Sequence, residues 1–480
     1  MEHKSLKQNL GFQTLYQIFN TCLPLITSPH LARSLGATQQ GVFSYTQSIV
    51  NCFALFAMLG VANYGTRTMA TCGENKAIRS KQFWSIYILQ GACSIASIVL
   101  YLVYIFIFKP DNTIIVWIQG LYLVGCLADI NWFFFGIEKF KTTVTRNMII
   151  RTLSVVMILL YVNKPNDLWV YTAIMAGSTV ISNGVLWLLI SKEIKFKDLW
   201  TISIKEILAH VKPNITLFVP LLGMSIYHIM DKTMLGSLSS YEQVGYYYNA
   251  DKIINIPMGI ISGIGTVMLP RMTSLVSANH KDEAQSVFLI SVEAVCAISC
   301  AMAFGIAAIA NEFTPLFFGN GFDPCIILII ALSPVLIIKG LTQTSRMQYL
   351  IPNHKDQIII QSVFIGATVN LAVNYVLISR LGAMGAVIGT LIAELVSCIW
   401  QYAKMSGCVK FTSIAIKPLI YVLFGFIMFI AVRLSAEFFC GGIIGILFEM
   451  LTGLLVYSGM CILFWKVTNS PILGFIKQKA

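Results

Sequence analysis

Apolar residues fill this chain in long stretches that are separated only by short polar loops, from about Gly11 to about Val467. A helix needs about 20 consecutive apolar residues to cross the hydrocarbon core of a bilayer, and the stretches have about this length. Strands of a membrane barrel are about half as long and alternate apolar with polar residues, a pattern that is not seen here. The sequence therefore predicts an all-α, polytopic membrane protein with about 14 transmembrane helices.

The predicted spans are residues 9–30, 41–64, 83–108, 114–136, 144–162, 168–191, 213–236, 248–270, 284–310, 324–347, 357–379, 383–403, 416–434 and 442–465. The first span follows a short basic start, is too long for a signal-peptide core and lacks a small-residue cleavage site, so we expect it to remain as a helix. Composition agrees, because 57% of the residues are hydrophobic and only 11% are charged, against about 25% charged in soluble domains.

Basic residues gather in alternate loops. If the N-terminus lies in the cytoplasm, 26 of the 33 Lys and Arg residues fall on the cytoplasmic side. The seven others are Arg33, Lys109, Lys164, Lys232, Lys252, Arg380 and Arg433. This asymmetry follows the positive-inside rule, so both termini are predicted to be cytoplasmic. The net charge of +12 is then an orientation signal, and no nucleic-acid partner is expected.

The loops also indicate how the chain is organised. We predict an N-terminal six-helix bundle over residues 1–192, a basic cytoplasmic linker over 193–212, a C-terminal six-helix bundle over 213–408, and two additional transmembrane helices with a basic tail over 409–480. An offset of 204 residues pairs Gly41 with Gly245, Ile49 with Ile253, Asn51 with Asn255 and Arg67 with Arg271. Two halves of six helices share one orientation, which predicts a parallel pseudo-repeat about an axis along the membrane normal.

Motifs of enzymes are not found in the sequence. There is no GxxxxGK[ST] phosphate loop, no HExxH and no GxSxG, and no outside loop holds paired carboxylates. The twelve Cys residues are scattered without a CxxC pair, which argues against a disulfide framework or a metal site. We therefore expect a protein that is not an enzyme and that has no metal and no cofactor.

Three segments carry a family resemblance. They are PHLARSLGATQQGVFSYTQSI at 29–49, DKTMLGSLSSYEQVGYYYNADKIINIPMGIISGIGTVMLPRM at 231–272, and RLGAMGAVIGTLIAELV at 380–396. Together they resemble the polysaccharide and O-antigen flippases (Wzx type) of the multidrug/oligosaccharidyl-lipid/polysaccharide exporter superfamily. The resemblance covers essentially the whole chain. It implies a bacterial inner-membrane protein that moves an undecaprenyl-pyrophosphate-linked oligosaccharide from the inner to the outer leaflet, by alternating access of a central cavity between two bundles. It also implies membrane lipid, a polysaccharide polymerase and chain-length proteins as partners.

Such a cargo carries a pyrophosphate, which Arg and Lys bind through short charge-assisted hydrogen bonds. A charge near the bilayer centre costs at least about 2.5 to 3.5 kcal/mol, so it usually faces a cavity or a partner. Lys252 is the first candidate, because it matches a basic position of the similar family helix; an ion pair or an interfacial anchor is the alternative. Arg33 and His30 lie three residues apart on one helix face, and similar flippases carry a basic residue at the position of Arg33. Anchoring for Arg33 and ordinary packing for His30 remain open.

Further candidates lie in corresponding places of the second half and at the cytoplasmic ends. His228, Asp231 and Lys232 can share a helix face and form a counterpart of the His30–Arg33 pair. Arg67 and Arg271 each lie at the cytoplasmic end of the second helix of a half. They either form a cytoplasmic gate or are ordinary residues of the positive-inside pattern. Asp231 and Asp251 are candidates for ion coupling, with local balance of Lys232 and Lys252 as the alternative.

Smaller features leave similar choices. The three tyrosines at 246–248 either stack on sugar rings or belong to an interfacial aromatic belt. Gly259/Gly263 and Gly385/Gly389 are GxxxG pairs that predict close helix packing. Two other functions remain as alternatives: a multidrug or cation antiporter of the same superfamily, whose cavity should favour carboxylates and aromatics over Lys and Arg, and a flippase of peptidoglycan-precursor lipid.

Overall fold

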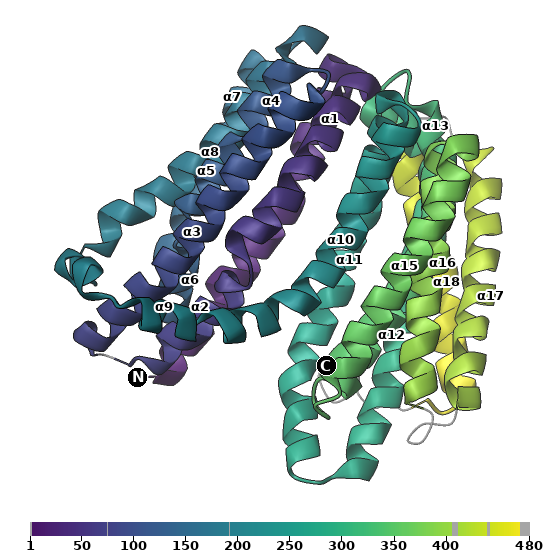
Figure 1. Ribbon diagram of the computed structural model, residues 1–480. Helices are drawn as coiled ribbons and strands as arrows, with labels where there is room; N and C mark the ends of the chain where they lie inside the picture. Colours follow the sequence, from purple (N-terminus) through teal and green to yellow (C-terminus); the bar gives the residue numbers. More distant parts are fainter. Residues whose placement is uncertain (1, 74, 192, 406–410, 439–441, 471–480) are drawn as a thin grey trace. The chain divides into compact units, whose positions relative to one another are not determined.

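The computed structural model describes residues 2–73, 75–191, 193–405, 411–438 and 442–470, and these residues form helices joined by short loops, without a strand (Figure 1). The side chains of residues 2–18, 21, 22, 224, 226–228 and 411–417 lie outside this description.

The helices are as follows: α1 (Glu2–Met58), α2 (Val61–Thr71), α3 (Lys76–Phe108), α4 (Thr113–Gln119), α5 (Leu121–Leu127), α6 (Asn131–Gly136), α7 (Phe140–Tyr161), η1 (Pro165–Asp167), α8 (Leu168–Ile190), η2 (Phe196–Thr201), α9 (Ile204–Ala209), α10 (Val211–Leu238), α11 (Tyr241–Ser277), α12 (Lys281–Phe318), α13 (Asp323–Leu332), α14 (Val335–Ser345), η3 (Arg346–Leu350), α15 (Asp356–Leu381), α16 (Ala383–Lys404), α17 (Phe411–Ala436) and α18 (Ile443–Val467).

The prediction of an all-α membrane protein is confirmed. Twelve segments of the described chain are helical, long and apolar enough to cross a bilayer. The predicted span 9–30 and most of the span 41–64 fall on α1, where Gly36 has φ 72° and ψ 177° and separates two helical parts; the last residues of the second span belong to α2. A positive φ of this kind costs little only for glycine, so one long helical stretch can serve as two spans.

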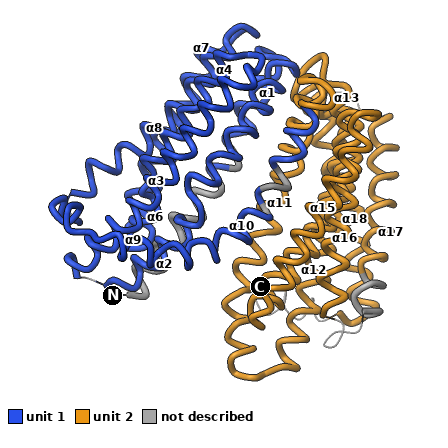
Figure 2. Tube along the Cα trace, viewed as in Figure 1, with its two compact units in different colours: residues 1–236 blue, residues 237–480 orange. Residues whose placement is uncertain are grey.

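The chain divides into two compact units, residues 1–236 and 237–480 (Figure 2). In unit 1 the described core is rich in aromatic rings: Phe83 stacks on Trp132 with centroids 5.4 Å apart, and Trp187 packs beside them. Gly65 and Gly136 let α2 and α6 approach, because a Cβ at either position would collide with Trp132 or with Met69. The predicted boundaries of the two bundles and the linker, at residues 192, 212 and 408, are placed by counting spans along the sequence. They stay a prediction.

Unit 2 is built around α12, which packs against α13, α14, α17 and α18. Polar contacts hold the two last helices to it. Tyr421 donates to the Glu293 carboxylate at 3.0 Å, and Tyr457 donates to the carbonyl of Ala297 at 2.7 Å. Breaking a buried hydrogen bond is costly, because the polar groups are left without a partner where water cannot reach them. The described parts of α17 and α18 therefore belong to the core of unit 2.

The two GxxxG pairs differ. A Cβ on Gly385 would lie 2.6 Å from the backbone carbonyl of Leu377, and one on Gly389 would collide with Asn374. At Gly263, by contrast, no described atom outside its own stretch of helix lies within 4 Å of such a Cβ. Close packing is therefore confirmed for Gly385/Gly389, between α15 and α16, whereas Gly263 does not have the tight neighbour that the prediction required.

The pseudo-repeat has a counterpart in side-chain geometry. In α1, Gln47 donates to Asn51 at 2.9 Å, and in α11, Asn255 donates to Asp251 at 2.8 Å. Each bond joins residues four apart, as expected on one helix face, and the pairs occupy positions that the 204-residue offset makes equivalent. The repeat therefore extends from sequence identities to a local contact.

Candidate functional site

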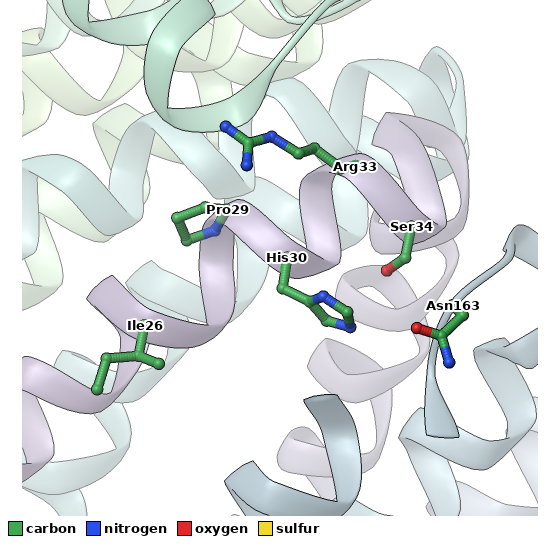
Figure 3. Close-up of a pocket in the computed structure, with 6 residues that line it drawn as sticks. All are labelled: Ile26, Pro29, His30, Arg33, Ser34 and Asn163. Carbon is green, nitrogen blue, oxygen red and sulfur yellow. The ribbon is translucent and has the colours of Figure 1, made fainter. Parts of the chain in front are cut away.

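A cavity of about 410 Å³ opens beside α1 in unit 1 (Figure 3). It is lined by Ile26, Pro29, His30, Arg33, Ser34 and Asn163. Asn163 belongs to the short connection between α7 and η1, and an Asp167 side chain accepts from its backbone N–H at 3.0 Å. The cavity is therefore bounded on one side by a helix and on another by an ordered loop.

His30 and Arg33 both reach this cavity, as their spacing predicts, but they have different surroundings. His30 Nε2 lies 2.7 Å from the carbonyl of Val162, which ties the imidazole to the loop. Arg33 is exposed, and in Figure 3 its guanidinium extends to the side of the helix opposite the His30 ring. Arg33 is therefore an exposed cation at the edge of this cavity, with its guanidinium directed away from the His30 ring, whereas His30 supports the cavity wall.

The candidates on α10 lie near the end of that helix. Asp231 is only 2% exposed and Lys232 is half-buried. The next residue, Thr233, shares a 2.8 Å hydrogen bond with Ser48 of α1, and Gly236 packs directly on the Tyr45 ring. The side chain of His228 lies outside the described residues. Asp231 and Lys232 thus sit where α10 is fastened to α1, inside unit 1.

Lys252 lies on α11 in unit 2 and is half-buried. Its ammonium lies 4.5 Å from the centroid of the Tyr248 ring, one helical turn earlier. A cation over an aromatic face gains about 0.5 to 2 kcal/mol. Its neighbour Asp251 accepts a hydrogen bond from Asn255.

The three tyrosines of α11 have separate roles. Tyr246 is 7% exposed and donates to Glu242 at 2.8 Å, and Tyr247 is 3% exposed and lies 3.2 Å from the Thr390 hydroxyl of α16. Buried phenols with partners are neither a belt at the membrane surface nor a platform for sugar rings. Tyr248, which is half-buried, is the tyrosine of this run that meets a cation.

Arg67 lines a second cavity of about 410 Å³ in unit 1, together with residues of α2 and α10. Its wall includes Tyr64, whose hydroxyl lies 2.6 Å from His210 Nδ1, and the other ring nitrogen of His210 lies 2.9 Å from the Ser85 hydroxyl. Burial lowers the pKa of His210, although Glu206 opposes the shift. Arg271, the repeat counterpart of Arg67, is exposed on α11.

A buried polar network in unit 1 was not predicted. Arg146 is 7% exposed and donates to Asn131 at 2.9 Å and to Asn147 at 2.6 Å, while Asn131 also donates to Asp129 and Asn183. The positive-inside count treated Arg146 as an ordinary cytoplasmic residue. The available signal was Asp129, an acidic residue inside a predicted span, because a carboxylate there needs a polar partner.

Two ion pairs in unit 2 also escaped the sequence reasoning. Lys339 and Glu394 lie 3.5 Å apart with side chains 16% and 14% exposed, although Lys339 counts among the cytoplasmic basic residues toward the end of the predicted span 324–347. Arg433 donates to both oxygens of Glu312 at 2.8 and 2.9 Å. This pair explains why a cation occurs in a region that the positive-inside rule leaves poor in cations.

Taken together, the helices and the polar groups between them define a multi-pass membrane transport protein. Residues 6–276 match the family described as polysaccharide biosynthesis protein, and the chain belongs to that family. A protein of Escherichia coli (strain K12) named for O-antigen transport is 22% identical to this chain, and the match covers 81% of this chain and 94% of that protein. A protein of Shigella dysenteriae named in the same way is 22% identical over 82% of this chain and 99% of its own. A protein of Haloferax volcanii named as a low-salt glycan biosynthesis flippase is also 22% identical, and the match covers 53% of this chain and 54% of that protein.

Solved structures agree on the fold. The lipid II flippase MurJ in an inward closed conformation superposes with a TM-score of 0.78 at 13% identity, over 96% of this chain and all of the other. An inward-facing multidrug transporter of the MATE family superposes with a TM-score of 0.60 at 13% identity, over 81% of this chain and 96% of the other. The resemblance to the O-antigen flippase family is confirmed by these findings, as is the prediction of a transporter that is not an enzyme.

Proposed function

We propose that the chain is a flippase for an undecaprenyl-pyrophosphate-linked oligosaccharide, and that it moves this lipid from the cytoplasmic to the periplasmic leaflet by alternating access. Relatives named for O-antigen transport and for a glycan flippase support a lipid-linked glycan as the cargo. The distribution of basic residues supports cytoplasmic termini, and the bacterial relatives support a location in the inner membrane.

One observation carries the proposal most directly: Arg33 is an exposed cation in the wall of a polar cavity on α1. A guanidinium presents a planar fork of donors that matches phosphate oxygens. His30, Ser34 and Asn163 line the same cavity, and they offer uncharged donors and acceptors that suit a hydroxylated headgroup. We assign Arg33 as a pyrophosphate contact.

Lys252 is assigned as a second pyrophosphate contact. It is half-buried on α11, and the Tyr248 ring beneath it lowers the cost of keeping an ammonium away from water. Lys232, Arg67 and Arg271 are assigned supporting roles as further cations along the route of the headgroup. Asp231 and Asp251 are assigned to ion coupling.

The cations also separate this proposal from the alternatives. An exporter of cationic drugs should line its cavity with carboxylates and aromatics, whereas the cavity on α1 has Arg33 and no described acidic residue in its wall. A flippase of peptidoglycan-precursor lipid meets the same physical demands, and the names of the curated relatives favour the polysaccharide repeat unit.

The test is reconstitution in liposomes that contain a fluorescent undecaprenyl-pyrophosphate oligosaccharide, with leaflet crossing measured for the wild type, Arg33→Ala and Lys252→Ala. A lost charge-assisted hydrogen bond is worth about 1.5 to 3 kcal/mol, so we expect crossing at low substrate to fall about tenfold or more. Arg33→Lys should retain part of the activity, because a point charge replaces the fork.

Lys164→Ala is the matched control. Lys164 is an exposed cation that directly follows Asn163 but does not line the cavity, so its removal should leave crossing unchanged. Equal crossing for the wild type, Arg33→Ala and Lys252→Ala would remove both residues from the site. No crossing by the wild type under any ion gradient or potential would favour the exporter function.

A further inference from the structure

The segment between α8 and α10 is fixed to the end of unit 1. The carbonyl of Lys195 accepts hydrogen bonds from Ser80 at 3.2 Å and from Trp84 at 3.0 Å, both near the start of α3. Ile194, Leu199 and Ile202 pack on the aromatic core of this unit. In Figure 1, α9 runs across the ends of the neighbouring helices. Ser80 and Trp84 flank residue 83, where the predicted span 83–108 begins, so the segment is attached at the end of that span.

Other residues of the same segment turn large apolar groups away from the protein. Trp200 is 88% exposed, Ile204 75% and Leu208 61%. These three residues come from η2 and α9, and they alternate with the inward-facing residues that hold the segment in place, among them Phe196, whose ring packs on Trp84 with centroids 5.5 Å apart. Apolar surface of this size is costly in water, and Trp is enriched where one side of a structure is apolar and the other is wet.

Exposed lysines stand beside these apolar residues. They are Lys195, Lys197, Lys205 and Lys212. Of the two acidic residues between 195 and 212, Glu206 accepts hydrogen bonds from the Ser203 backbone and hydroxyl at 2.7 and 3.0 Å, in the cap of α9. The outward face is therefore both apolar and basic, which is the composition of segments that lie in the headgroup layer of anionic membranes.

We propose that residues 195–212 form a binding surface for anionic phospholipid headgroups, with Trp200, Ile204 and Leu208 inserted below the headgroups and Lys195, Lys197 and Lys205 in contact with their phosphates. The occupant is the bilayer that surrounds the protein, and charge complementarity selects its anionic lipids. The residues named here as lipid contacts line neither of the two cavities described above, and the proposal does not depend on which substrate crosses the membrane.

The test is hydrogen–deuterium exchange of the full-length protein in nanodiscs of phosphatidylcholine, with and without phosphatidylglycerol. A lysine near an anionic surface strengthens binding about fivefold, so the amides of residues 196–209 should exchange at least about fivefold more slowly when phosphatidylglycerol is present. About 1 M salt shortens the Debye length to about 3 Å and should abolish the difference.

Two variants separate the contributions. The triple variant Lys195→Gln/Lys197→Gln/Lys205→Gln should lose the dependence on phosphatidylglycerol, whereas Lys141→Gln, a change of an exposed lysine on α7, should keep it. Trp200→Ser should speed exchange in both lipids. Exchange of residues 83–108 reports whether each variant is folded.

Equal exchange in the two lipids for the wild type would overturn the proposal, as would a triple variant that keeps the difference. Slow exchange that is equally strong in detergent would also overturn it, because the segment would then be protected by the protein alone. None of these readouts uses substrate crossing, so failure here is distinct from failure of the proposed function.

Discussion

Gly385 provides a direct test of the packing between α15 and α16. An added Cβ would lie 2.6 Å from the carbonyl carbon and oxygen of Leu377 and 2.7 Å from the N atom of Ile378. Ordinary contact begins at 3.4 Å, so the two helices would have to separate by about 0.8 Å. Backbone atoms of a packed helix cannot rotate aside as a side chain can, and overpacking of this kind costs about 1–3 kcal/mol.

Gly263→Ala is the matched variant, because it makes the same chemical change in a helix where no described atom outside the local helix backbone lies within 4 Å of the new Cβ. Both substitutions gain the same helix propensity, about 1 kcal/mol for Gly to Ala. That gain cancels when the two variants are compared. The difference between their free energies of unfolding therefore isolates the cost of the collision. Gly385→Ala should be less stable than Gly263→Ala by about 1–3 kcal/mol.

Thermal unfolding of the two purified variants, followed by intrinsic fluorescence, gives the comparison. For a unit of about this size, 1 kcal/mol shifts the Tm by about 2–4 °C. Gly385→Ala should thus melt about 2–12 °C below Gly263→Ala. Equal melting temperatures, or a lower value for Gly263→Ala, would refute the reasoning, since helix packing could then accommodate a methyl group without cost.

Three further predictions concern polar contacts. Arg146→Gln should destabilise unit 1 by about 1.5–3 kcal/mol, because it removes a charged donor from a buried network. The control Arg151→Gln, at an exposed arginine, should cost less than about 1 kcal/mol. Denaturation followed by fluorescence measures both free energies of unfolding. The stability advantage of wild type over His210→Gln should be constant above about pH 6.5 and should decline as the pH falls below that value. The reason is that burial lowers the pKa of His210 in the folded state, while the unfolded imidazole protonates near pH 6.5. Melting curves across pH test this, and an advantage that grows in acid would contradict it. Arg433→Gln and Glu312→Gln should each lower the melting temperature, and the double variant should lose less than the sum, with a coupling of about 1 kcal/mol; strict additivity would show that the pair contributes nothing.

Local sequence patterns were sufficient for the helices and for the class of protein. Span length and the scarcity of charge follow from the thickness and the low polarity of the bilayer, so they can be counted along one chain. The pairing of His30 with Arg33 also follows from helix periodicity, since residues three apart share a face, and both line one cavity.

Contacts between distant residues were decided by tertiary structure alone. Lys339 and Arg433 have the same sequence signature as any basic residue near a span end, yet each is held by a partner far along the chain. Arg146 has this signature too, and it is held by Asn147 and by Asn131 of another helix. The opposite outcomes at Gly385 and Gly263 have the same origin, because a GxxxG spacing specifies a smooth helix face but not what packs against it. The segments that are apolar and long enough to cross a bilayer could be identified from the sequence, since transfer into lipid depends on the composition of each segment alone. The folded structure decided which charges and glycines have neighbours, because those contacts depend on how separate helices pack.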